Sequence, residues 1–267
     1  MRAAAAYTCL MTTRTTMWTA GTPCWVDCAF APEHRGMHHA RDFYGKLFGW
    51  HIEEGPEDTG GYLTCLKDDH AAAGLMPHMS EDQPTVWSTY LATDDVDATC
   101  NAVRSAGGQV IVEPTTVTDL GRMAFCVDPT GAAFGLWQAG VHRGFGIYNE
   151  PGSVAWNDLM TRDLATAREF YGAVFGYQFQ ETGPGYVTFS VPGSGPVGGI
   201  HQADELADDV PASWLVHFCV ADRDSSAQIA QELGAQILMT MDTPFGPEAL
   251  MQGKHGEVFS LIELIGQ

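Results

Sequence analysis

The fold is decided by the stretch Ala40-Arg41-Asp42-Phe43-Tyr44-Gly45-Lys46-Leu47-Phe48-Gly49-Trp50, which returns almost unchanged as Ala167-Arg168-Glu169-Phe170-Tyr171-Gly172-Ala173-Val174-Phe175-Gly176-Tyr177. From Arg41 to Arg168 the offset is 127 residues. Such a repeat within one chain indicates a duplicated unit. In both copies the apolar residues fall on one face of a helix, and a glycine follows the last turn, where helices commonly end. The repeat therefore predicts two related halves, each with this helix packed on a sheet.

Other landmarks keep the same spacing on both sides of the repeated helix. Trp87 and Trp214 are 127 residues apart, and so are Gly107 and Gly234. Strand-like segments begin each half, at residues 22–30 and 154–160, and short strands separated by Gly and Pro follow each helix. Asp94-Asp95-Val96-Asp97 supplies an N-cap and first-turn acids for a further helix. Each half therefore has the order β-α-β-β-β twice, and the chain contains four such units.

The spacing also sets the domain boundaries. We expect a disordered tail over 1–21, a first domain over 22–140, a linker over 141–151 and a second domain over 152–267. A chain of 267 residues divided in this way gives two domains of ordinary size, each able to bury its own core.

Charge and composition restrict the classes of partner. The net charge is −20, from 33 acidic and 13 basic residues, which disfavours nucleic acids and anionic lipid and mildly favours cationic ligands. The sequence contains no convincing signal-peptide core and no apolar stretch of membrane-spanning length, so a cytoplasmic location is expected. Its seven cysteines are an odd number with no C-x-x-C pair, which favours reduced, buried thiols.

The two F-Y-G-x-x-F-G-[WY] helices and the turn and strand from Asp128-Pro129-Thr130-Gly131 to Gln138 resemble the vicinal-oxygen-chelate superfamily. This superfamily includes glyoxalase I, extradiol dioxygenases, fosfomycin-resistance enzymes and bleomycin-binding proteins. Gly121-Arg122-Met123-Ala124 more narrowly resembles two-domain glyoxalase-like proteins of actinobacteria, some of them associated with antibiotic clusters. The resemblance implies an α+β fold of two tandem glyoxalase-like domains with curved, mostly antiparallel sheets. It does not assign a chemistry, because one fold hosts many functions.

The resemblance also implies positions for a divalent metal, which this chain fills with unsuitable residues. The first ligand position falls on Trp25 and Trp156, and an indole has only an N–H donor. The terminal ligand position falls on Gly135 and Ser260, and neither supplies a carboxylate. We therefore predict no metal and no cofactor. A separate group, His34, His38 and His39, is interpreted as part of a solvated surface loop.

The side chains expected to face inward favour a ligand pocket. Trp25 and Asp27 share one strand face, and Trp156 and Asp158 share the matching face in the second half. The other side chains expected to face this pocket, as ligand contacts or as an acid or base, are Tyr90, His217, Met123 and Met251. Tryptophan, tyrosine and methionine suit a flat, apolar ligand, and an inward carboxylate requires solvent or a partner. Asp27, Asp158 or His217 could instead act as a general acid or base without metal.

Several functions stay open at this point. The first hypothesis is metal-independent binding of an aromatic or polycyclic small molecule, in antibiotic resistance or natural-product biosynthesis. The second is a metal-free lyase, isomerase, cyclase or accessory to an oxygenase, and the third is a metal-dependent glyoxalase or dioxygenase. The expected partner is a small hydrophobic or aromatic ligand that could be cationic, and both a monomer and a homodimer are compatible with an internal tandem.

Overall fold

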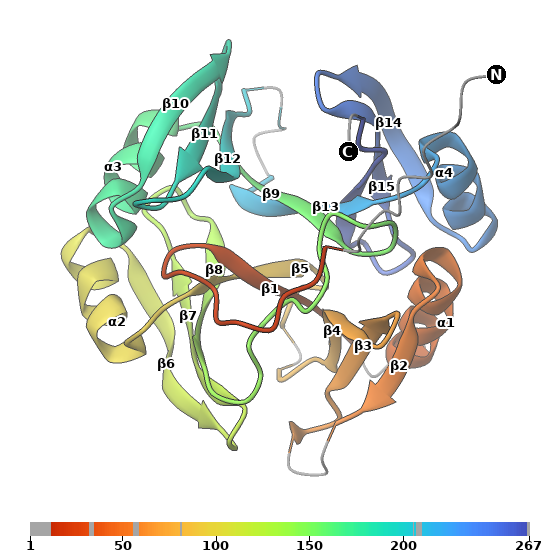
Figure 1. Ribbon diagram of the computed structural model, residues 1–267, viewed down its shortest axis with the longest axis horizontal. Helices are drawn as coiled ribbons and strands as arrows, with labels where there is room; N and C mark the ends of the chain where they lie inside the picture. Colours follow the sequence, from red (N-terminus) through yellow and green to blue (C-terminus); the bar gives the residue numbers. More distant parts are fainter. Residues whose placement is uncertain are drawn as a thin grey trace, which may run out of the picture.

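The computed structural model describes residues 12–31, 35–55, 59–80, 82–204, 206 and 210–265. Two eight-stranded sheets, one from each half of the chain, lie next to one another with their helices on the outside (Figure 1). The predicted α+β fold of two tandem domains is confirmed, and the sheets are mostly antiparallel, with parallel pairs in each.

The first domain contributes strands β1 to β8 and helices α1 and α2. Its sheet has the order β2-β3-β4-β1-β5-β8-β7-β6. Parallel pairing joins β1 to β4 and β5 to β8, and the remaining neighbours are antiparallel. The elements are β1 Pro23–Phe30, α1 Gly36–Phe48, β2 His51–Glu54, β3 Leu63–Lys67, β4 His70–Pro77, β5 Trp87–Ala92, α2 Val96–Ser105, β6 Gln109–Val117, β7 Gly121–Val127 and β8 Ala133–Ala139.

The second domain repeats this topology with the order β10-β11-β12-β9-β13-β16-β15-β14. Its elements are β9 Val154–Thr161, α3 Leu164–Phe175, β10 Gln178–Gly183, β11 Tyr186–Ser190, β12 Pro196–Gln202, β13 Ser213–Cys219, α4 Arg223–Glu232, β14 Gln236–Thr243, β15 Gly246–Gln252 and β16 Val258–Ile262.

The repeated helices α1 and α3 end as their sequence predicts. Gly49 and Gly176 follow them with φ of 69° each, the left-handed conformation that glycine adopts without strain. Helix α1 begins at Gly36, earlier than expected. His38 and His39 therefore lie on this helix, which corrects their assignment to a surface loop, whereas His34 lies outside the described residues.

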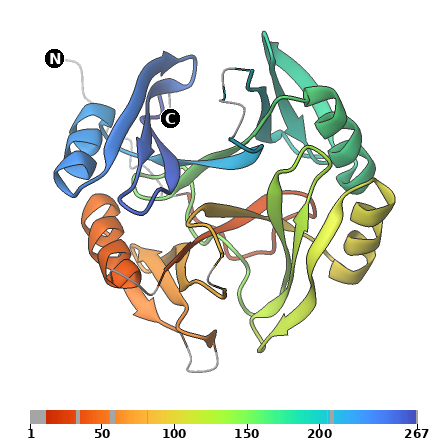
Figure 2. The same ribbon diagram turned by 180° about the vertical axis from the view of Figure 1, so that it is seen from behind.

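The tyrosine of each F-Y-G motif joins the two domains. Tyr44 Oη accepts the Trp87 indole N–H at 3.1 Å and donates to Glu257 of the second domain at 3.1 Å. Tyr171 does the same in the opposite direction, with Trp214 at 3.2 Å and Asp128 of the first domain at 3.0 Å. Because all of these groups are buried, the paired contacts fix how the domains meet, with α1 beside α4 and α2 beside α3 (Figures 1 and 2).

The described part of the expected tail, residues 12–21, runs along the linker. The Arg14 backbone N–H donates to Gly146 O at 2.9 Å, and the Trp18 ring packs edge-on against Phe145 and Tyr148. A cavity of about 220 Å³ lies between this segment and the first domain, with Trp18 and Trp137 in its wall. Among the described residues, no helix is both long and apolar enough to cross a membrane.

Candidate functional site

The polar face of the second sheet is built on β9, where alternate residues point to the same side. Trp156 and Asp158 share this face, and the register places Trp156 opposite His217 of β13. His217 in turn lies beside Ser260 of β16. Strand pairing alone therefore brings together side chains that are up to 104 positions apart in the chain, since Trp156 and Ser260 flank the same histidine.

Asp158 accepts hydrogen bonds from two aromatic side chains. The Trp156 indole N–H donates to Asp158 Oδ1 at 2.9 Å, and Tyr186 Oη donates to the same oxygen at 2.9 Å. Gly199 lies opposite Asp158 on β12, and a Cβ there would come within 2.2 Å of both Asp158 Oδ1 and Tyr186 Oη. Glycine at this position thus leaves the space in which the carboxylate and the phenol meet.

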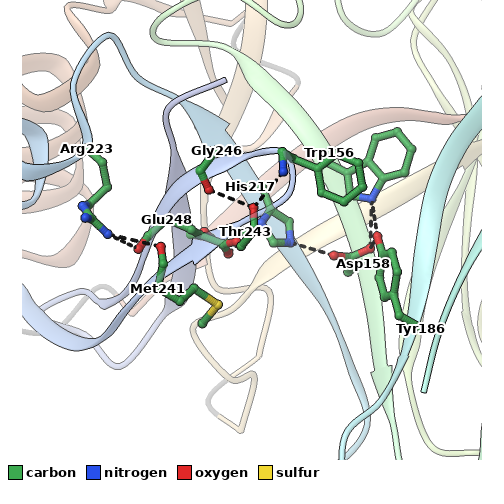
Figure 3. A network of polar contacts seen from close by, with 11 residues as sticks. Trp156, Asp158, Tyr186, His217, Arg223, Met241, Thr243, Gly246 and Glu248 are labelled. Carbon is green, nitrogen blue, oxygen red and sulfur yellow. Dashed lines mark hydrogen bonds and ion pairs between the residues drawn. The ribbon is translucent and has the colours of Figure 1, made fainter. Parts of the chain in front are cut away.

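His217 lies between two carboxylates, as Figure 3 shows. Its Nε2 is 3.1 Å from Asp158 Oδ2, and its Nδ1 is 3.1 Å from Glu248 Oε1. Burial by itself lowers the pKa of His217, but contacts with Asp158 and Glu248 outweigh burial and raise the pKa to about 10. The imidazole is therefore protonated at neutral pH and lies as a cation between the two carboxylates.

Glu248 is held on β15 by contacts from three sides. Ser260 Oγ donates to Glu248 Oε1 at 2.6 Å, and Arg223 at the start of α4 donates from Nη1 to the Glu248 carbonyl oxygen at 2.6 Å (Figure 3). Burial raises the pKa of Glu248, but His217 and Ser260 outweigh it, so the net change is downward. The site therefore carries two carboxylates and one imidazolium, a net charge of about −1.

Strand β14 lies next to Glu248 and contributes apolar side chains to the same face of the sheet. Met241 of β14 pairs with Glu248, and Met239 pairs with Leu250, so both methionines share the face of Glu248. They are 37% and 48% exposed, and Trp156 and Tyr186 are partly exposed. The polar centre is thus flanked by accessible thioether and aromatic surface.

The first domain contains the same frame with a different centre. The Trp25 indole N–H donates to Tyr62 Oη at 2.7 Å, and Tyr62 Oη donates to Asp27 Oδ2 at 3.3 Å. Tyr90 takes the place of His217, since it lies opposite Trp25 and beside Gly135. Burial raises the pKa of Asp27 to about 7, although hydrogen bonds from Tyr90 and Tyr62 act against it.

The linker packs against the first-domain frame. The ring of His142 meets Trp25 edge-on with centroids 4.4 Å apart, and the ring of Phe145 is 5.7 Å from Trp25. Trp25 is 3% exposed and Tyr90 is 6% exposed. Burial lowers the pKa of His142 to about 4, so this histidine is neutral at pH 7.

The structure therefore brings the predicted residues into two groups. Asp158, His217 and Trp156 meet in the second domain, and Asp27, Trp25 and Tyr90 meet in the first. Met123 of β7 pairs with Trp137 and is partly exposed.

Met251 differs from these residues, because its side chain is fully buried in the core. It points to the face of β15 opposite to that of Glu248. This placement corrects the expectation that Met251 faces a ligand. The repeat aligns Met123 with Glu248 instead.

Sequence reasoning missed Glu248, Tyr62 and Tyr186. The two tyrosines lie at matching places, one at the start of β11 and the other directly before β3. The repeat itself could have indicated both tyrosines, because they occupy equivalent places in the two halves. In each half the strand at this tyrosine pairs with a glycine, Gly74 or Gly199, and that glycine lies opposite the aspartate. Glu248 carried no signal, because Met123 is its partner in the repeat.

The side chains of the second-domain site do not suit a divalent metal. His217 separates the two carboxylates, so one ion cannot contact both of them and a ring nitrogen. A protonated imidazole has no lone pair to donate, and Trp156 offers only an N–H. Within the part of the chain that the structure describes, no group of three or more His, Cys, Asp and Glu side chains is arranged to hold a metal ion.

Comparison with known proteins identifies the family. The family model described as Glyoxalase/Bleomycin resistance protein/Dioxygenase superfamily matches residues 35–136, and the model described as Bleomycin resistance protein-like N-terminal matches residues 154–192. Anthracycline biosynthesis protein DnrV of Streptomyces peucetius is 37% identical, over 93% of this chain and 95% of its own length. The chain belongs to the glyoxalase, bleomycin resistance protein and dioxygenase superfamily.

Other relatives of this superfamily member have different descriptions. Putative glyoxylase CFP32 of Mycobacterium tuberculosis is 36% identical over 91% of this chain and 95% of its own length. Among solved structures, the Mn(II)-bound glyoxalase of Novosphingobium aromaticivorans has a TM-score of 0.64 at 16% identity, covering 91% of this chain and 82% of that one. The 2,3-dioxygenase LapB of Pseudomonas sp. KL28 has a TM-score of 0.63 at 10% identity, with 93% of both chains covered. At these identities the structural matches establish the fold alone.

Proposed function

We propose that the chain binds a planar aromatic or polycyclic small molecule on the polar face of the second domain, without a metal ion, in natural-product biosynthesis or resistance. The observation that carries this proposal is the position of His217 between Asp158 and Glu248, with one carboxylate 3.1 Å from each ring nitrogen. Such a centre offers no ligand set for a metal, but it anchors the aromatic side chains around it.

The surroundings of the site support a flat ligand. Trp156 and Tyr186 offer ring faces, and Met239 and Met241 offer adaptable apolar contacts on the accessible side. The net negative centre accepts hydrogen bonds from hydroxyl or ammonium groups on the ligand. Two relatives described as anthracycline biosynthesis proteins, DnrV and DauV, are each 37% identical, which supports a role with a molecule of this kind.

The charges that these contacts favour suit binding better than acid–base catalysis at this site. A general acid or base works best with a pKa near the operating pH. With a pKa of about 10, His217 keeps its proton at neutral pH, and Glu248 has a lowered pKa. These groups therefore serve as a fixed charged frame.

The test is a titration of the purified full chain with a hydroxylated anthraquinone, before and after treatment with EDTA. We expect saturable quenching of tryptophan emission that EDTA leaves unchanged. Binding that appears only when Mn²⁺, Fe²⁺ or Zn²⁺ is added would contradict metal independence. Absence of saturable quenching with planar polycyclic compounds would contradict the ligand class.

A second candidate function, metal-free acid–base catalysis, is favoured by Asp27 alone. Its pKa of about 7 is in the range that suits a general base, and Tyr62 and Tyr90 hydrogen bond to it. Turnover of a bound compound that Asp27→Asn abolishes, while affinity is kept, would support this function. Equal behaviour of wild type and Asp27→Asn would exclude Asp27 as the base.

A further inference from the structure

A second cavity, of about 140 Å³, lies where the two domains meet and shares no residue with the site above. Helix α1 of the first domain forms one wall, and the turn between β15 and β16 of the second domain forms another. Both views of the fold place α1 beside the second domain at this point (Figures 1 and 2). The basic side chains in its lining are His39, Lys46, Lys254 and His255.

The concentration of basic groups is unusual for this chain. The whole sequence contains three lysines, and two of them, Lys46 and Lys254, line this one cavity in a protein of net charge −20. Both lysines are exposed, and neither forms an ion pair with another described residue. An ammonium group binds phosphate and carboxylate as a point charge, so two unpaired ammonium groups at one cavity favour an anion.

The imidazoles complete the basic side of the cavity. The rings of His39 and His255 are stacked, with centroids 5.8 Å apart and an angle of 30° between their planes. His39 comes from α1 and His255 from the β15–β16 turn, so each domain contributes one lysine and one histidine. An occupant held by all four would connect the domains.

The lining also contains two acidic residues. Asp42 is exposed, with Oδ2 3.8 Å from His38 Nδ1, so solvent screens its charge. Glu257 is 2% exposed, and its two oxygens accept the Tyr44 hydroxyl and the His255 backbone N–H, at 3.1 Å each. Burial raises the pKa of Glu257, which favours its neutral form.

We propose that this interdomain cavity is a binding site for a small oxyanion, a phosphate or carboxylate group, held by Lys46 and Lys254 with His39 and His255. The site is independent of the aromatic ligand, so its failure leaves the proposed function intact. Because the anion contacts both domains, it stabilises their association in the folded chain.

The test measures thermal unfolding of the full chain as inorganic phosphate is added at constant ionic strength, followed by the same series with acetate. Phosphate also stabilises proteins non-specifically, so the comparison is with variants at the same concentration. The double variant Lys46→Met/Lys254→Met removes the proposed ligands, and Lys67→Met, which changes the remaining lysine, is the matched control.

We expect a saturable rise in melting temperature for wild type and Lys67→Met, and at least about tenfold weaker binding for the double variant, since each contact is charge-assisted. Lys46→Arg/Lys254→Arg is expected to keep binding, which separates loss of charge from loss of folding. Saturation with acetate alone would assign the site to carboxylates. Equal shifts in wild type and the double variant, or no saturable shift with either anion, would overturn the proposal.

Discussion

The two domains share one frame and differ at its centre. In both, a tryptophan and a tyrosine surround an aspartate that faces a glycine on the parallel strand. The second domain adds an imidazolium between two carboxylates, whereas the first has Tyr90 at the position of His217 and Met123 at the position of Glu248. The difference is therefore one of charge compensation within a common scaffold.

The buried aspartate therefore has different partners in the two domains. Asp158 lies 3.1 Å from the imidazolium of His217, while Asp27 has hydroxyl partners and a pKa raised to about 7 by burial. Gly135 allows the change, because a Cβ there would lie 2.1 Å from the Tyr90 ring, whereas Ser260 in the second domain donates to Glu248. Tyr90 therefore requires a glycine beside it, whereas beside His217 the serine is needed to hold Glu248.

The largest expected effect follows from removing the cation of the second domain. His217→Leu leaves Asp158 and Glu248 with side chains 12% and 10% exposed and without their shared counter-ion. Loss of one partner of a buried ion pair costs about 3–5 kcal/mol, so we expect the free energy of unfolding at pH 7 to fall by that amount. Urea unfolding of both proteins measures it.

The matched change in the first domain is Tyr90→Phe, which removes a hydroxyl but no charge. We expect a loss of about 1 kcal/mol. If His217→Leu cost no more than Tyr90→Phe, the charged centre of the second domain would have no role in stability.

The free energy of unfolding should depend on pH in a different range for each domain. The native pKa of Asp27, about 7, exceeds its ordinary value of 3.8, so the folded state holds this proton longer and stability falls as pH rises from about 4 to 7. The pKa of His217 is also raised, to about 10 from 6.5, so its contribution is complete below about 6.5 and is lost as pH rises towards 10.

Asp27→Asn is expected to remove the fall in stability between about pH 4 and 7 and to raise the free energy of unfolding at pH 8 by about 1–3 kcal/mol. The fall in stability at higher pH, which comes from His217, should remain. Urea unfolding from pH 4 to 10 checks this prediction. An unchanged slope between pH 4 and 7 would show that Asp27 titrates normally in the folded chain.

The sequence was sufficient for the fold because its signals are local or periodic. The repeated F-Y-G helix with its terminal glycine predicted α1 and α3, and Asp95 caps α2 as the run Asp94–Asp97 suggested. The constant spacing then placed the remaining units, since a duplicated chain repeats its topology. The early start of α1 at Gly36 could not be read, because its first turn carries no apolar period and no side-chain cap.

The site could be predicted only in part because its chemistry depends on register. Trp156 with Asp158 follows from strand alternation, and His217 was selected as an inward residue near them. Its ion pair with Glu248 required the pairing of β13 with β16 and of β16 with β15, which no local pattern encodes. The prediction that Met251 contacts a ligand is wrong for the same reason, because Met251 and Glu248 are an odd number of positions apart on β15 and point to opposite faces.

A smaller loss of stability is expected when Glu248 is replaced by methionine, the residue at the equivalent position of the first domain. Glu248→Met leaves His217 with Asp158 alone, so the raised pKa of His217 should move down from about 10 but stay above its ordinary value. Ser260 Oγ also loses its acceptor, and we expect a total cost of about 1–3 kcal/mol. NMR titration of the histidine ring protons measures the pKa. A pKa that does not move would show that Glu248 contributes nothing to holding the proton.

The smallest expected effect concerns ligand affinity, and it tests which domain carries the proposed binding function. Trp156 is partly exposed on the accessible face, whereas Trp25 is 3% exposed and covered by His142 and Phe145. An aromatic contact of this kind contributes about 1 kcal/mol, so Trp156→Phe should weaken binding of a hydroxylated anthraquinone by about fivefold. Trp25→Phe should leave the affinity unchanged and lower stability instead. Calorimetric titration suits both variants, because it does not depend on the indole that each one lacks. If Trp25→Phe weakened binding and Trp156→Phe did not, the ligand would belong to the first domain, and the covered frame there would have to open to admit it.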